Sequence, residues 1–190
     1  MTKIHTGKYR LPFMIEWTKY LLGDLGKIVG GSTPSTSNNI YFGGNISWIT
    51  PKDLSNHKGR YISHGERNLT DDGFKNCSAK IIPKNSILFT SRAPIGYIAI
   101  AENKLCTNQG FKSIIPNDKI DHLFLYYLLL NNRKEIENMG SGTTFKEISG
   151  TVMKQIEVNI PTNKTEQIKI SHVLDGLDSR IEVNNAINHN

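Results

Sequence analysis

Residues 165–188 read TEQIKISHVLDGLDSRIEVNNAIN, and this stretch decides the architecture of the chain. Apolar side chains recur along it at intervals of four, three and four residues: Ile170, Leu174, Leu177 and Ile181. Asn184 continues the series, which is the a/d pattern of a helix that packs against another helix. As a helix the stretch is about 36 Å long. Its apolar seam requires a cover, either a second helix or the chain's own domain.

Towards the N-terminus, helical and extended segments alternate irregularly. Residues 152–160 predict a strand closed by Pro161. Residues 121–139 predict a helix that ends at Gly140 and has one shared face: Leu123, Tyr126, Tyr127, Leu130 and Lys134. Between these two segments, Thr144 and Glu147 have the spacing of a capping box and predict a second short helix.

The first 120 residues are rich in short β-branched or aromatic runs separated by Gly, Pro and Asn. These runs predict strands at 46–50, 60–63, 87–91, 97–101 and 111–115. A short helix is predicted at 68–76, and a strand or short helix at 21–29. Residues 1–20 have little pattern. We expect an α+β fold, with an irregular mixed-strand domain at 1–162, its leader at 1–20, and a protruding coiled-coil helix at 163–190.

The positive charge belongs to the domain rather than to the helix. The chain carries a formal net charge of +6, and residues 164–190 hold three basic against four acidic side chains, so residues 1–163 carry +7. A basic body suits contact with DNA phosphates, although an ordinary basic protein has the same balance. Cys77 and Cys106 lack metal spacing and predict reduced thiols. Without an apolar run of about 20 residues or a signal peptide, we expect a cytoplasmic protein with no membrane segment.

A series of short blocks runs through most of the chain in a fixed order. They are LGDL at 22–25, GGSTP at 30–34, YFGG at 41–44, ISWITPKDL at 46–54, LFTSR at 88–92, PIGYIAI at 94–100, TNQGF at 107–111, GSG at 140–142, IS at 148–149, IP at 160–161 and EQIKI at 166–170. Each block is common by itself. In this order they resemble the specificity subunits of type I restriction-modification enzymes.

The resemblance implies a function in DNA recognition. In this family two recognition domains, each followed by a long helix, normally share one chain, and their antiparallel helices hold the domains apart on a bipartite target. Here one such half is present, either as a natural half-subunit that forms a homodimer or pairs with another half, or as a fragment. The implied partners are double-stranded DNA, the methyltransferase subunits and, through them, the endonuclease and translocase subunit. S-adenosylmethionine, Mg²⁺ and ATP belong to those partners, and this chain needs no cofactor.

Sequence reading requires cations on phosphates and polar groups at base edges. The candidate DNA contacts lie in or beside predicted turns: Lys52, Lys75, Lys80, Arg92, Thr143, Thr144 and Lys146. Each cation alone is more often a solvated surface charge. We interpret Asn108 and Gln109 as bracing the backbone, because a block shared by readers of different targets should not select a base. The GGSTP block is read as a structural turn, and Tyr41, Phe42 and Trp48 as core residues.

Two other classes of function compete with DNA recognition. Glu102-Asn103-Lys104, with Asp71 and Asp72 upstream, matches part of a nuclease signature that would bind Mg²⁺. The triplet falls in a predicted turn, where polar residues are ordinary, so we predict no catalytic and no metal-binding residue. His57 and His64 lack partners at ligand spacing. The other alternative is an interaction module whose helix seam docks another chain and whose basic face is incidental.

Overall fold

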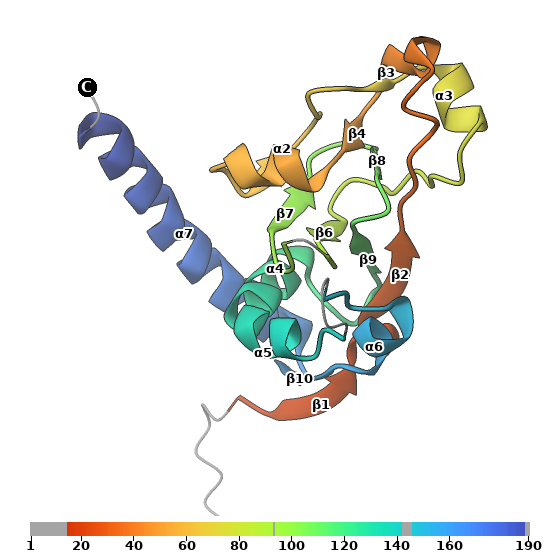
Figure 1. Ribbon diagram of the computed structural model, residues 1–190. Coiled ribbons are helices and arrows are strands. Elements are labelled where there is room, and N and C mark those ends of the chain that lie inside the picture. The colour runs from red at the N-terminus through yellow and green to blue at the C-terminus, as the bar shows by residue number, and fades with distance from the viewer. Residues whose placement is uncertain (1–14, 93, 142–145, 189–190) are drawn as a thin grey trace, which may run out of the picture.

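The computed structural model describes residues 15–92, 94–141 and 146–188. The chain has both helices and strands and ends in one long helix, as the predicted α+β class requires (Figure 1). In chain order the elements are β1 (Trp17–Leu21), α1 (Leu22–Leu25), β2 (Gly26–Gly30), the 3-10 turn η1 (Asn39–Tyr41), β3 (Phe42–Ile46), β4 (Trp48–Ile49), α2 (Pro51–Asn56), β5 (Tyr61–Ile62), α3 (Asp71–Lys75), β6 (Ile87–Phe89), β7 (Ile98–Ala101), β8 (Cys106–Thr107), β9 (Lys112–Pro116), α4 (His122–Asn131), α5 (Arg133–Asn138), α6 (Gly150–Gln155), β10 (Glu157–Pro161) and α7 (Lys164–Asn188).

A five-stranded sheet with the order β2-β9-β6-β7-β5 forms the centre of the domain. Its neighbours are antiparallel except for β5 and β7, which run parallel. Two smaller pairs flank it: β4 with β8 in parallel, and β1 with β10 antiparallel. The strands are short and their connections irregular, as the scattered β-branched runs predicted.

Two apolar cores form because successive side chains of a strand point to opposite faces of the sheet. Ile87 and Phe89 of β6 belong to a core shared with α4, α5, α6 and β10. Leu88, between them, belongs to a second core that includes Leu54 of α2. All three β6 side chains are fully buried. Cys77 and Cys106 are both free thiols, as predicted.

Helix α4 corrects the prediction of a single amphipathic helix at 121–139. The helical region is divided at Asn132 into α4 and α5, and Asn132 donates a side-chain hydrogen bond to the Leu128 carbonyl. Six of the ten α4 residues are buried, because the helix packs against β6 and β7 and also against α7. Leu130 and Lys134 were predicted to share a face with Leu123, Tyr126 and Tyr127, but those three are buried whereas Leu130 and Lys134 are exposed. Burial on several sides removes the periodicity that the prediction used.

Three other segments differ from expectation. Residues 152–160 form two elements, the end of α6 and then β10, because Ser149 caps a helix through the Val152 amide. Four of the five β1 residues, 17–20, fall in the leader that had no pattern, and β1 pairs with β10. Glu147 bridges Ser141 and Arg92 instead of standing in the first turn of a helix. Its predicted capping partner, Thr144, lies outside the described residues.

Gln167 joins the start of α7 to the domain. Its side chain is fully buried and its Nε2 donates to the carbonyls of Pro161, at 2.9 Å, and Lys119, at 3.1 Å. Its Oε1 accepts from the Asp121 amide at 2.9 Å. One side chain therefore ties together the end of β10, the start of α4 and the first turns of α7. No helix in the described part of the chain is long and apolar enough to cross a membrane.

The GGSTP block packs directly on the TNQGF block. The Ser32 amide donates to the Thr107 carbonyl at 2.9 Å. A Cβ at Gly31 would overlap the carbonyl oxygens of Thr107 and Asn108, whereas a Cβ at Gly30 would meet open space. Close packing therefore requires a glycine at position 31 but not at position 30.

We expect Gly31→Ala to lower the free energy of unfolding by about 2–3 kcal/mol, because the backbone must move to admit the methyl group. Gly30→Ala is the matched control and should change stability by less than about 0.5 kcal/mol. Urea denaturation followed by circular dichroism measures both. Equal stability of the two variants would contradict this packing.

The ionisation of Asp121 makes the stability of the fold depend on pH in the acid range. Burial opposes its ionisation, but hydrogen bonds from His122, the Phe124 amide and Ser171 outweigh burial and lower the pKa of Asp121 to about 2. Because this pKa lies below the ordinary value of about 3.9, the stabilisation is complete above about pH 4. It is lost as the pH falls through about 2.

Asp121→Asn keeps the oxygen that caps α4 and removes the titration. We expect wild type to lose on the order of 2 kcal/mol more stability than the variant between pH 4 and pH 2. Urea denaturation across this pH range measures the difference. Parallel pH profiles for the two proteins would show that the carboxylate has no such role.

Candidate nucleic-acid interface

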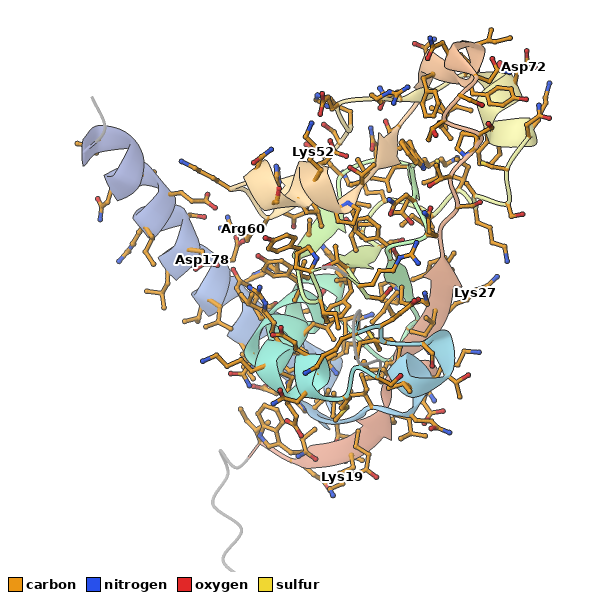
Figure 2. All side chains as sticks on the ribbon, in the orientation of Figure 1. Lys19, Lys27, Lys52, Arg60, Asp72 and Asp178 are labelled. Carbon is orange, nitrogen blue, oxygen red and sulfur yellow. The ribbon has the colours of Figure 1, made fainter. Side chains whose placement is uncertain are left out.

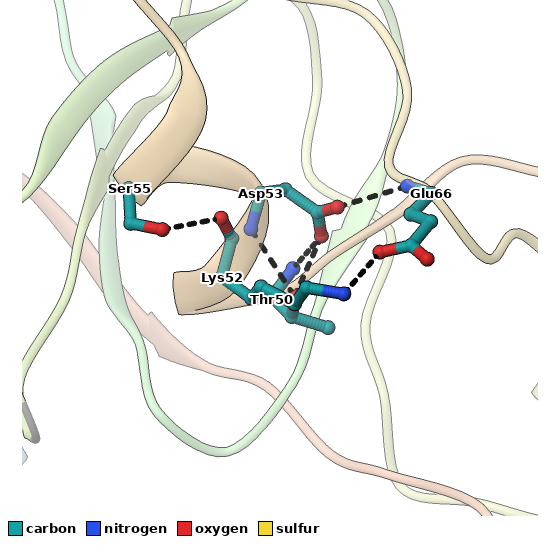
Figure 3. A network of polar contacts seen from close by, with 5 residues as sticks. All are labelled: Thr50, Lys52, Asp53, Ser55 and Glu66. Atoms are coloured by element: carbon teal, nitrogen blue, oxygen red, sulfur yellow. Dashed lines mark hydrogen bonds and ion pairs between the residues drawn. The ribbon is translucent and has the colours of Figure 1, made fainter.

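Lys52 stands in the first turn of α2, within a network of polar contacts (Figure 3). Thr50 caps the helix and forms a reciprocal capping box with Asp53. The second oxygen of Asp53 accepts from the Glu66 amide at 2.9 Å, and the Glu66 carboxylate lies 2.7 Å from Lys52 Nζ. This hydrogen bond to Glu66 raises the pKa of Lys52. Both side chains are mostly exposed, so the pair is weak and Lys52 can exchange Glu66 for a phosphate.

Arg92 and Lys146 both adjoin Glu147, Arg92 through an ion pair and Lys146 as its neighbour in the sequence. Arg92 pairs with Glu147 in an isolated bridge, and its guanidinium lies 3.9 Å from the carboxylate. Lys146 precedes Glu147 and is exposed. The predicted contacts Thr143 and Thr144, in the same loop, lie outside the described residues. The structure thus brings two of the predicted cations to one place, beside a glycine-rich segment.

Lys112 is a third cation at this place, and the sequence analysis missed it. Its amine lies 3.2 Å from Glu147, and its side chain is 17% exposed. Its position directly after the TNQGF block was the available signal, because that block leads into β9 beside β6. Arg92 and Lys112 both lie within ion-pair distance of the Glu147 carboxylate, so two cations meet one acid at this place.

Lys75 and Lys80 lie elsewhere, in and after α3 at the end of the domain away from β1 (Figure 1). Both are exposed, and within the described ranges neither has an acid at ion-pair distance. The five predicted cations therefore do not form one cluster. They occupy α2, the α3 end and the surroundings of Glu147.

The shared blocks brace each other, as was predicted for Asn108 and Gln109. Asn108 Oδ1 accepts from the Gly110 amide at 2.9 Å, and Gln109 accepts from the Thr33 hydroxyl. Trp48 is buried and its Nε1 donates to the Ser32 carbonyl at 3.1 Å, which confirms it as a core residue. These groups make contacts within the protein and position the surrounding loops.

The residues of the nuclease alternative lie in separate elements. Asp71 and Asp72 occupy the first turn of α3, whereas Glu102 is exposed in the turn after β7. His57 and His64 line one shallow polar hollow, beside Asp53 and Glu66. Over residues 15–92, 94–141 and 146–188, no group of three or more His, Cys, Asp or Glu side chains could hold a metal ion.

The predicted helix seam, Ile170, Leu174, Leu177 and Ile181, is divided between two environments. Ile170 packs against the main core of its own domain. Farther along α7 the exposure rises from 36% at Leu174 to 51% at Leu177 and 56% at Ile181. Helix α7 extends away from the domain (Figure 1), so this part of the seam faces solvent in a single copy.

A family model described as the type I restriction modification DNA specificity domain matches residues 14–190. The specificity subunit of the type I restriction enzyme MjaIX of Methanocaldococcus jannaschii is 48% identical over 169 residues, covering 88% of this chain and 39% of that protein. The EcoR124I/EcoR124II specificity subunit of Escherichia coli is 32% identical over 173 residues, covering 87% of this chain and 41% of that protein.

The fold also matches a solved structure. A crystal structure of a type I restriction-modification S subunit from M. genitalium aligns with a TM-score of 0.66 at 23% identity, covering 91% of this chain and 42% of that one. The chain thus spans about two-fifths of the length of the relatives it matches.

Proposed function

The chain belongs to the family of type I restriction-modification DNA specificity domains, and we propose that it reads one half of a bipartite DNA target. In this role it has no catalytic activity of its own. It directs methyltransferase subunits, and through them the endonuclease and translocase subunit, to that target. Its ligand is double-stranded DNA, and it works in the cytoplasm. S-adenosylmethionine, Mg²⁺ and ATP are the cofactors of the partner subunits.

The observation that carries this proposal is the match of one domain and one helix to about two-fifths of each relative. The named relatives are specificity subunits, and the net positive charge lies in the domain rather than in the helix. A single half needs a second one to read a bipartite target. The exposed seam of α7 supplies a surface on which two helices can pair.

We propose that two copies pair through this seam. Closed two-fold symmetry makes both copies use the same surface. The DNA site then repeats that symmetry, so the bipartite target is a palindrome. A second, different half in place of the copy would give a target without this symmetry.

The phosphate contacts are proposed to be Lys52, Lys75, Lys80, Arg92 and Lys146, with Thr143 and Thr144 beside the last. The five cations occupy three places on the domain, which suits a surface that follows the DNA backbone. Lys146 is the most direct test, because it is exposed and sits next to the glycine-rich segment.

Lys146→Ala should weaken binding to all DNA sequences alike and reduce the slope of log K against log salt concentration by about 0.9, the loss of one phosphate contact. Binding by the assembled complex is measured by fluorescence anisotropy between low and moderate salt. Lys19→Ala is the control, because Lys19 is an exposed lysine paired with Glu157 on the β1–β10 ribbon. An unchanged slope would remove Lys146 from the contacts, and a loss of preference at one base would make it a base contact.

Leu177→Asp should abolish pairing of the chain and assembly of the complex, since it places a charge in the middle of the seam. Sedimentation velocity measures the mass of the species formed. Val183→Asp is the matched control: Val183 is 58% exposed but lies about 120° around the helix from Leu177. If Leu177→Asp assembles as wild type does, α7 is not the pairing surface.

The interaction-module alternative rests on the same exposed seam. It predicts that the chain still assembles with a partner but that DNA binding does not depend on sequence. Competition by unrelated DNA of equal length separates this alternative from specific recognition.

A further inference from the structure

Arg60 connects two parts of the chain that are far apart in sequence. It directly precedes β5, and its side chain is 12% exposed. Its guanidinium contacts four side chains of α7, and Figure 2 shows Arg60 close to one of them, Asp178. They are Asp175 at 2.9 Å, Ser179 at 2.9 Å, Glu182 at 3.0 Å and Asp178 at 4.0 Å. The Asp175 contact, to Nε, is an ion pair without hydrogen-bond geometry, whereas the contacts to Ser179 and Glu182 are hydrogen bonds.

These four residues lie on one face of α7. Their spacing of three, one and three residues places them above one another along the helix. Successive residues are turned by about 100°, so this face points away from the seam around Leu177. The planar guanidinium, with its fixed fork of donors, suits several acceptors along one helix face. Arg60 therefore binds the acidic face of α7 and leaves the apolar seam of the helix exposed.

The domain side of this contact is held by the central sheet. The Arg60 carbonyl accepts from the Ile100 amide of β7 at 2.7 Å. A second tie comes from α4, where the Tyr127 hydroxyl donates to Asp178 at 2.9 Å. Gln167 fixes the start of α7, and Arg60 meets the helix eight to fifteen residues farther on. At 1.5 Å per residue these ties lie about 12–22 Å apart. Contacts at two separate points along α7, at Gln167 and at Arg60, fix the direction of the helix relative to the domain.

We propose that Arg60 is a positioning residue that sets the angle between α7 and the recognition domain, and thereby the number of base pairs between the two half-targets. This inference rests on the proposed function. A tilt of about 10° at the base of a helix about 36 Å long moves its far end by about 6 Å. That displacement equals about two base pairs of DNA. A small change in the helix angle at Arg60 would therefore shift the second half of the complex by a distance that matters for target recognition.

The test compares wild type and Arg60→Met in the assembled complex. The substrates are duplexes that carry the two half-targets of the wild-type motif at separations that differ by one base pair. We expect wild type to prefer one separation. In Arg60→Met, discrimination between this separation and its neighbours should fall at least tenfold, while the bases read within each half stay the same. The discrimination between separations by Arg60→Lys should lie between those of wild type and Arg60→Met, because one ammonium group cannot pair with carboxylates along the whole helix face.

A general loss of stability would lower binding at every separation equally, so the ratio between separations reports positioning alone. Lys19→Met, which breaks the exposed Lys19–Glu157 pair, is the control and should keep the wild-type ratio. If Arg60→Met does not fold, the double variant Asp175→Asn with Glu182→Gln removes two of the negative charges that face Arg60, at half-exposed sites. It should broaden the preference in the same way.

An unchanged preference for separation in a folded Arg60→Met, or in the double variant, would overturn the positioning role and leave the proposed function intact. Binding by wild type that ignores both half-targets would overturn the proposed function and this inference with it. The two failures are therefore distinguishable in one set of duplexes.

Discussion

The buried amide of Gln167 is the contact on which the arrangement of this molecule depends. It satisfies the Pro161 and Lys119 carbonyls and the Asp121 amide at the point where β10, α4 and α7 converge. A buried amide group is costly unless its donors and acceptors are paired, so the three segments hold each other at this point. Asp121 strengthens the junction, because it caps α4 and also accepts from Ser171 of α7.

From this junction α7 leaves the domain with two chemically different faces. The acidic face turns towards Arg60 and Tyr127, while the apolar face, with Leu177 and Ile181, stays exposed. The acidic side chains of α7 thus pair with Arg60 of their own domain. The other basic side chains of the domain stay available for other partners. This division accounts for a basic body carrying a nearly neutral helix. It also orients the seam outward, where a second helix can reach it.

The sequence predicted the elements whose signal is local and periodic. The spacing from Ile170 to Ile181 indicated α7, and β-branched runs indicated most of the short strands. Contacts between segments that are distant in sequence had no such signal. β1 near the start of the domain pairs with β10 at its end, and Arg60 contacts residues more than 110 positions farther along the chain. The acids at 175, 178 and 182 are a weak signal of a basic partner for that helix face. The cations were predicted in or beside turns, but Lys52 and Lys75 lie in the short helices α2 and α3, and Lys112, the first residue of β9, had no such signal.

The most direct test of the central claim is a map of methylated adenines across the genome of the native host, with and without this gene. The account predicts that deletion removes one bipartite motif and leaves the others, and that this motif is a palindrome if two copies pair. An unchanged methylation pattern after deletion would contradict a role in target recognition.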